Sequence, residues 1–301
     1  MKILLTAAAC VLSTSAWAEV PRVVTDIAPV QSLVAQIMQG VGTPDLIVPP
    51  AASPHDHAMR PSEARDLANA NIVIWMGPTL TPWLEGSIGA LAPNATHLAL
   101  QDHADTVLPF REGAQFEAHE HEAHEHADEP AEEFDPHMWL DPTNAQAWVT
   151  KITAVLIAQD PENKEKYLKN SAEATQSLNV LDTQIQQQLT PYKERPFVVF
   201  HDAFHYFEAR YDVEAAGAIS GSNAQAPSPR RLREIEHVIE KSGAVCVFTE
   251  PQFNSGIVDA VSGKVRVGTI DPIGFNLPVD HKMYWKMLQN IADGFEACLS
   301  D

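Results

Sequence analysis

The stretch DPENKEKYLKNSAEATQSLNVLDTQIQQQLTP, residues 160–191, decides which architecture the rest of the chain can adopt. Asp160 is a good helix N-cap, and Pro161 stands where the first helical residue is expected. No glycine or proline interrupts the chain from Glu162 to Leu189, and apolar side chains recur at roughly helical spacing at Tyr167, Leu168, Ala172, Leu178, Leu181 and Ile185. The stretch therefore predicts one helix roughly 40 Å long, since each residue adds about 1.5 Å. The alternative is a helix packed inside a single domain.

Short β-branched runs, with helical patterns between them, lie on both sides of this helix. They are residues 22–26, 45–50 and 72–77 before it, and 197–202, 213–219, 244–250 and 265–271 after it. Such alternation is typical of parallel sheets covered by helices. The sequence thus predicts an α/β protein with two lobes, each a parallel sheet flanked by helices, joined by one long central helix. The predicted boundaries are 19–159 for the first lobe, 160–190 for the connecting helix and 191–301 for the second lobe.

The composition narrows the range of partners. The chain has 301 residues, 45% of them hydrophobic, which is enough to build a large core or two smaller ones. Asp and Glu number 40 against 20 Lys and Arg, for a net charge of -20. A surface this acidic repels phosphate backbones and anionic lipids. We therefore expect no nucleic-acid partner and an affinity for cations.

Residues 1–18 have the pattern of a secretory signal peptide. One lysine precedes an apolar run, and Ala16-Trp17-Ala18 is a small-x-small cleavage site, so cleavage after Ala18 is predicted. A buried N-terminal helix and lipid attachment at Cys10 are the alternatives. No later stretch approaches the roughly 18 apolar residues of a membrane helix. The sequence predicts an exported, soluble protein.

Loss of the signal peptide leaves two cysteines, Cys246 and Cys298. An even pair in an oxidising compartment predicts a disulfide. In the chain-entropy description, a bridge closing so long a loop stabilises the fold by roughly 4 kcal/mol. Because Cys246 lies within an apolar run, two separate buried thiols are the alternative.

The segment 116–133 differs in kind from the rest of the chain. It is rich in acids, has no aliphatic side chain larger than alanine, and contains His119, His121, His124 and His126. It cannot bury enough apolar surface to offset the entropy of ordering, which predicts a disordered surface loop. The histidines form either a low-affinity, exchangeable metal site that passes its ion to a second site or an ordinary solvated surface.

Four other residues are candidate metal ligands. His55 follows the apolar run of residues 45–50, while His201 and Asp271 follow predicted strands directly. His137 lies in FDPHMWLDP, residues 134–142, where two Asp-Pro pairs restrict the backbone on either side of it. Ligands of open parallel sheets bind beyond the carboxyl ends of the strands. We expect these four residues to meet in a cleft between the lobes.

Three imidazoles and one carboxylate suit tetrahedral Zn²⁺. Mn²⁺ or Mg²⁺ would favour more oxygen ligands, and Cu²⁺ stays an alternative because its affinity for such sites is higher. Singly, each residue also has an ordinary explanation, such as an Asp-Pro turn at Asp271. Their convergence on one predicted cleft favours the metal site.

Four segments, SPHDHAMRPS (53–62), FDPHMWLDP (134–142), VVFHDAFHYFEARY (198–211) and TIDP (269–272), resemble the cluster A-I metal-binding receptors of bacterial ABC importers. The resemblance covers essentially the whole mature chain and is strongest to the zinc members, which carry a similar acidic, His-rich loop. It implies a periplasmic location, a membrane permease as partner, and zinc coordination by His55, His137 and His201. Manganese members carry a carboxylate at the position of His201. Cys246 and Cys298 match a disulfide of some zinc members.

The chain departs from some relatives at Pro54, where they have a glutamate. The fourth ligand is then Asp271 or water, and we favour Asp271. His57 and His205 are expected to have no part in the site. The predicted function is therefore a monomeric zinc receptor and not an enzyme. The alternatives are a zinc hydrolase suggested by His55-Asp56-His57, a manganese or copper receptor, and an adhesin or structural zinc protein.

Overall fold

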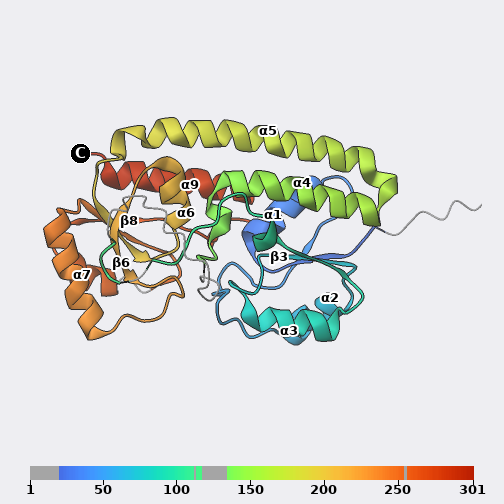
Figure 1. The fold of residues 1–301 in the computed structure, drawn as a ribbon, viewed down its shortest axis with the longest axis horizontal. Helices are drawn as coiled ribbons and strands as arrows, with labels where there is room; N and C mark the ends of the chain where they lie inside the picture. The colour runs from blue at the N-terminus through green and yellow to red at the C-terminus, as the bar shows by residue number, and fades with distance from the viewer. Residues whose placement is uncertain (1–19, 112, 117–133, 254–255) are drawn as a thin grey trace, which may run out of the picture.

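A computed structural model describes residues 20–111, 113–116, 134–253 and 256–301. Two parallel four-stranded sheets lie side by side, and the long helix α5 (Lys164–Leu189) runs along both of them (Figure 1). The predicted fold class is confirmed. The predicted signal peptide and the histidines at 119–126 lie outside the described residues.

The first sheet has the strand order β2-β1-β3-β4. Its strands are β1 (Val23–Thr25), β2 (Asp45–Leu46), β3 (Ile72–Trp75) and β4 (Thr96–Ala99). Its helices are α1 (Ala28–Ile37), α2 (Pro61–Ala68), α3 (Pro82–Leu91) and α4 (Pro142–Gln159), with the short 3-10 helices η1 (Leu100–His103) and η2 (Met138–Leu140). Side chains alternate between the two faces of a strand. Val24 and Val73 therefore pack in one cluster with Leu67 of α2 and Leu84 of α3, while Ile72 and Ile74 face α1 and α4.

The second sheet repeats this plan with the order β6-β5-β7-β8. Its strands are β5 (Phe197–His201), β6 (Ala215–Ser220), β7 (Cys246–Thr249) and β8 (Arg266–Thr269). Its helices are α6 (His205–Tyr211), α7 (Pro229–Ser242), α8 (Gly256–Ser262) and α9 (Met283–Leu299). Two 3-10 helices, η3 (Pro161–Asn163) and η4 (Thr190–Tyr192), flank the connecting helix α5. Val198 and Val247 pack toward α7 and α8, whereas Phe197 and Phe248 pack toward α9.

The two lobes share one hydrophobic core. A single cluster of buried side chains contains Ile74 of the first sheet, Phe248 of the second, and residues of α1, α4, α5 and α9. Helix α5 contacts α1 and α4 on one lobe and α9 on the other. A wide opening of the lobes would expose part of this core to water, which is unfavourable. Relative motion of the lobes is therefore restricted to small displacements.

The buried stripe of α5 differs from the one predicted at two positions. Tyr167, Leu178, Leu181 and Ile185 are buried as expected, whereas Leu168 is 43% exposed. Ala172 is exposed as well. The helical repeat of 3.6 residues places Asn170 and Ala174 on the buried face instead. Asn170 is accommodated there because its side-chain amide donates to the carbonyls of Ile37 and Gln39.

Strand β4 and the pairing of residues 114–116 with β6 were not predicted. Strand β4 is only four residues long and half exposed, so its sequence gives little periodic signal. The segment 114–116 adds an antiparallel pairing at the β6 edge of the second sheet, where the amide of Phe116 donates to the Ala216 carbonyl at 3.0 Å. Gly217 is required there, because a Cβ would lie 2.0 Å from the Ala114 carbonyl oxygen.

The predicted disulfide between Cys246 and Cys298 is confirmed. It joins β7 to α9, with Cα atoms 5.9 Å apart. In the part of the chain that the structure describes, no helix has the length and apolar character needed to cross a membrane.

Candidate metal centre

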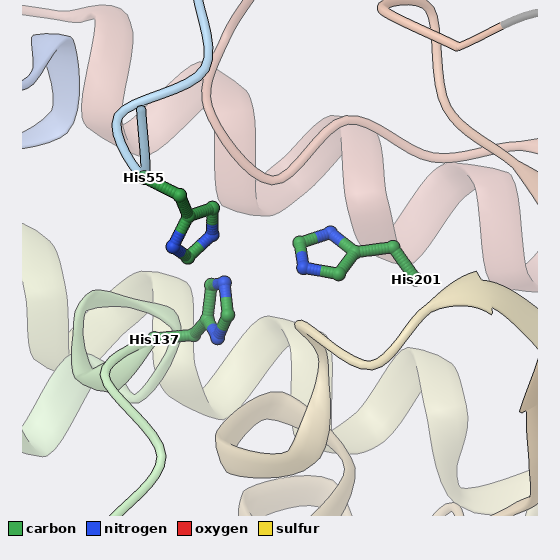
Figure 2. A group of neighbouring side chains, drawn as sticks. All are labelled: His55, His137 and His201. Atoms are coloured by element: carbon green, nitrogen blue, oxygen red, sulfur yellow. The ribbon is translucent and has the colours of Figure 1, made fainter. Parts of the chain in front are cut away.

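Three histidines from separate segments meet between the two lobes. His55 lies in the loop between β2 and α2, His137 directly precedes η2, and His201 is the last residue of β5. Their ring centroids are 5.0 to 5.9 Å apart, and one potential ligand atom from each lies within 4.8 Å of the other two. Each ring turns a nitrogen toward the shared space (Figure 2). The described residues contain no other such group of histidine, cysteine or acidic side chains.

The position of each histidine follows from the local fold. Strand β5 is buried along its whole length, so its last side chain, His201, projects at the carboxyl edge of the sheet and stays 4% exposed. The loop after β2 brings His55 to the corresponding edge of the first sheet. Both edges face the cleft, where ligands of parallel sheets bind.

His137 is oriented by Asp135. Its backbone amide donates to the Asp135 carboxylate at 2.9 Å, and its Nδ1 lies 2.7 Å from the same oxygen. Burial lowers the pKa of His137 well below its usual value, so the ring is neutral. Burial also raises the pKa of Asp135 to about 6. With Nδ1–H donated to this carboxylate, Nε2 is the nitrogen left for a metal, which is a common arrangement behind zinc-binding histidines.

His201 has two partners. Its Nδ1 lies 3.4 Å from Glu250 Oε2, and its Nε2 lies 2.8 Å from the Ser222 carbonyl oxygen. Burial alone would lower the pKa of His201, but the charge of Glu250 and these hydrogen bonds outweigh burial and raise the pKa above its usual value. The ring therefore donates from both nitrogens when protonated. A metal bound at Nε2 must replace that proton and the Ser222 contact.

The pKa of His55 is shifted in the opposite direction to that of His201. Burial lowers the pKa of His55 to about 2, with a smaller contribution from repulsion by His137 and His201 in their protonated forms. The surrounding pocket is largely apolar, and includes Trp139, Phe253, Pro272 and Ile273. An apolar pocket strengthens the attraction between a cation and its ligands.

Asp271 lies outside the group of three histidines. Its Oδ1 accepts hydrogen bonds from the backbone amides of Ile273 at 3.1 Å and Gly274 at 2.9 Å. Burial raises the pKa of Glu250, the carboxylate beside His201, and the charge of Asp271 raises it further. The assignment of Asp271 as fourth ligand stays a prediction.

The two remaining histidines near the site contact other side chains. His57 Nε2 lies 2.9 Å from Glu63 Oε2, and His205 Nδ1 lies 3.8 Å from Asp135 Oδ2. Neither belongs to the group of three.

Sequence reasoning missed Asp135, Glu250 and Ser222, the partners of the site histidines. Asp135 could have been found, because it stands two residues before His137 in the Asp-Pro-His motif. Glu250 directly follows the apolar run of β7, and His201 ends the corresponding run of β5, so the position of Glu250 at the sheet edge could also be predicted from the sequence. The Ser222 carbonyl gives no sequence signal.

The protonation states predict a shallow pH dependence of zinc binding. His55 and His137 are already neutral, so His201 is the one histidine of the three from which zinc must displace a proton. The pKa of His201 is raised, and at pH values below this pKa the proton competes with zinc for the ring. Above about pH 6, where Asp135 is mostly ionised, affinity should fall about tenfold for each unit that the pH is lowered below the pKa of His201. Three histidines of ordinary pKa, about 6.5, would approach a thousandfold per unit at lower pH. Competition with a chelator at several pH values measures this slope. A slope of two or three protons would contradict these assignments.

Two α/β lobes with a shared core, and with imidazoles from both converging on one point, define a two-lobed binding protein with a metal centre between its lobes. The family described as "Zinc-uptake complex component A periplasmic", ZnuA, matches residues 23–298. The chain belongs to the ZnuA family.

Individual relatives agree with this assignment. The chain is 38% identical to the high-affinity zinc uptake system protein ZnuA of Brucella suis over 305 residues, covering 92% of this chain and 91% of the relative. It is 38% identical to the protein of the same name from Paracoccus denitrificans, covering 99% and 97%. The solved periplasmic zinc-binding protein TroA from Treponema pallidum has a TM-score of 0.76 at 21% identity, covering 93% of this chain and 99% of that chain, and so shares the fold.

Proposed function

We propose that this chain is the zinc receptor of an ABC importer, which captures one Zn²⁺ between its lobes and delivers it to the membrane permease. The observation that carries this proposal is the convergence of His55, His137 and His201 within 4.8 Å. Family membership and the zinc-uptake names of its relatives support it.

The ligand set favours zinc over other divalent ions. Neutral imidazoles suit Zn²⁺ in a tetrahedral site, whereas Mn²⁺ favours oxygen ligands. Histidine, and not a carboxylate, at position 201 supports the same choice. The fourth ligand is Asp271 or a water molecule, with Asp271 the residue we favour.

Several further features belong to the proposal. The signal peptide, residues 1–18, is removed after Ala18 and the protein acts in the periplasm as a monomer. The lobes comprise residues 19–159 and 191–301, joined by 160–190. The receptor makes and breaks no covalent bond. His119, His121, His124 and His126 offer a weaker, exchangeable site that loads the main one.

Metal titration of the mature protein, residues 19–301, beside a variant lacking 117–133, tests the proposal. We expect one tight zinc ion in both proteins, extra weak zinc only in the full-length form, and competition by Mn²⁺ only at far higher concentration. Zinc loading should be slower without the loop. Equal affinity for Mn²⁺, or loss of the tight ion on loop deletion, would contradict the assignment of the main site. An unchanged loading rate would refute only the role of the loop.

A further inference from the structure

His55 is the only one of the three site histidines whose position is not fixed by an adjacent helix or strand. His201 ends β5 and His137 directly precedes η2, whereas His55 lies in the irregular segment 49–60. Its own amide makes one contact, with Ser53 Oγ at 3.3 Å. A metal ligand in such a segment must be held by side chains from elsewhere, because a mobile ligand loses conformational entropy on binding.

Trp83 holds the residue that precedes His55. Trp83 lies in the first turn of α3, and its indole Nε1 donates to the Pro54 carbonyl at 2.8 Å. This contact spans 29 residues of sequence and joins the His55 segment to a helix of the same lobe.

His57 holds the segment on the other side. Its side chain is only 6% exposed, and its Nε2 donates to Glu63 Oε2 at 2.9 Å. The same carboxylate oxygen accepts the Arg60 backbone amide at 2.7 Å, which fixes Glu63 at the start of α2. The His57 ring also packs against Trp83, with ring centroids 5.5 Å apart. One residue on either side of His55 is therefore tied to a helix.

We propose that Trp83, His57 and Glu63 are positioning residues that hold His55 in place for zinc, and that none of them touches the ion. This inference rests on the proposed zinc site. His57 is not part of the three-histidine group, and its Nε2 is used by Glu63. The clamp, defined as the side chains of Trp83, His57 and Glu63, acts by limiting the positions that His55 samples before the metal arrives.

Zinc affinity of His57 variants tests the clamp. His57→Ala should weaken zinc binding about tenfold, the lower end of the 10- to 100-fold range for direct partners of metal ligands, because His57 holds the segment of His55 and not its ring. His57→Gln keeps a side-chain N–H donor for Glu63 and should recover most of that loss. Trp83→Phe keeps an aromatic ring but removes the indole N–H that donates to the Pro54 carbonyl, and should also weaken zinc binding. His97→Ala, which removes an exposed histidine from β4 in the same lobe, is the matched control and should bind zinc normally.

The decisive measurement is a double variant. In a His55→Ala background the clamp has no ligand to position, so adding His57→Ala should cause no further loss of affinity. If His57 bound zinc itself, or acted only on the general stability of the lobe, its removal would cost affinity in both backgrounds. Either that result or normal affinity in His57→Ala would overturn the inference.

The same series separates this inference from the proposed function. A large loss in His55→Ala with no effect of His57→Ala leaves the zinc site intact and removes only the clamp. An unsubstituted protein that fails to bind zinc, or a His55→Ala variant that binds normally, would overturn both. Melting temperatures of the metal-free variants, expected to stay close to that of the unsubstituted protein, show whether the lobe stays folded.

Discussion

Replacing His201 by alanine is expected to weaken zinc binding about 100- to 1,000-fold, because structural zinc sites share roughly 10–16 kcal/mol among about four ligands. His201 is the only one of the three histidines contributed by the second lobe. Its loss leaves Asp271 as the only proposed ligand from that lobe, with Glu250 no longer paired to an imidazole. Competition against a chelator of known zinc affinity, at pH 7, measures the change.

The control for this prediction is His237→Ala, which removes an exposed histidine from α7 of the same lobe. It should bind zinc as tightly as the unsubstituted protein. His201→Gln keeps a hydrogen-bonding side chain beside Glu250 and so is less prone to misfold than the alanine variant. It should lose nearly as much zinc affinity as His201→Ala. Retention of tight binding by a folded His201→Gln protein would show that His201 is not a required ligand.

Replacing Arg111 by methionine is expected to destabilise the protein by about 3–5 kcal/mol, the usual cost of leaving a buried ionic partner uncompensated. Arg111 donates to both Asp202 and Glu208, and all three side chains are at most 8% exposed. Burial disfavours the charge of Arg111, but these two carboxylates outweigh burial and raise its pKa. The ring of Phe116 lies 4.0 Å from the guanidinium carbon. Arg111 thus ties the segment before residue 112 to the second lobe, next to His201.

Chemical denaturation of the metal-free protein measures this loss. Arg230→Met, in which an exposed arginine loses its pairing with Glu234, is the control and should leave the midpoint unchanged. Adding Glu208→Gln to Arg111→Met should restore part of the stability, because one buried charge is then removed. An Arg111→Met midpoint equal to that of the control would mean that Asp202 and Glu208 are compensated in another way.

Most of the fold was predictable because its signals are local. Strands such as β3 and β5 are apolar runs, and no glycine or proline interrupts α5. The predicted start at Asp160 was wrong by one turn, because η3 comes first and α5 begins at Lys164, with no side-chain cap hydrogen bond from Asn163. The pairing of residues 114–116 with β6 was not predictable. It joins segments 102 positions apart at Gln115 and Gly217, and its short sequence has no strand periodicity.

The three histidines were identifiable because each follows or precedes a recognisable signal, such as the strand before His201 or the Asp-Pro pairs around His137. The protonation state of His201 could not be predicted from the sequence. It depends on Glu250 and the Ser222 carbonyl, which contact His201 only in the folded protein. The sequence favours Asp271 as a zinc ligand. In the structure its Oδ1 accepts hydrogen bonds from the backbone amides of Ile273 and Gly274.

The shared core connects this site to function. Because α5 and its neighbours join the lobes without a flexible hinge, zinc capture requires only local adjustment around His201 and the Ser222 carbonyl. A site assembled in advance loses less entropy on binding than one that closes over its ligand.

A crystal structure of the zinc-loaded mature protein, with anomalous data collected at the zinc edge, tests the central claim most directly. The account predicts a peak between the rings of His55, His137 and His201, with zinc–nitrogen distances of about 2.0–2.1 Å. A peak bound by only one of the two lobes, or the absence of a peak between these three rings, would contradict it.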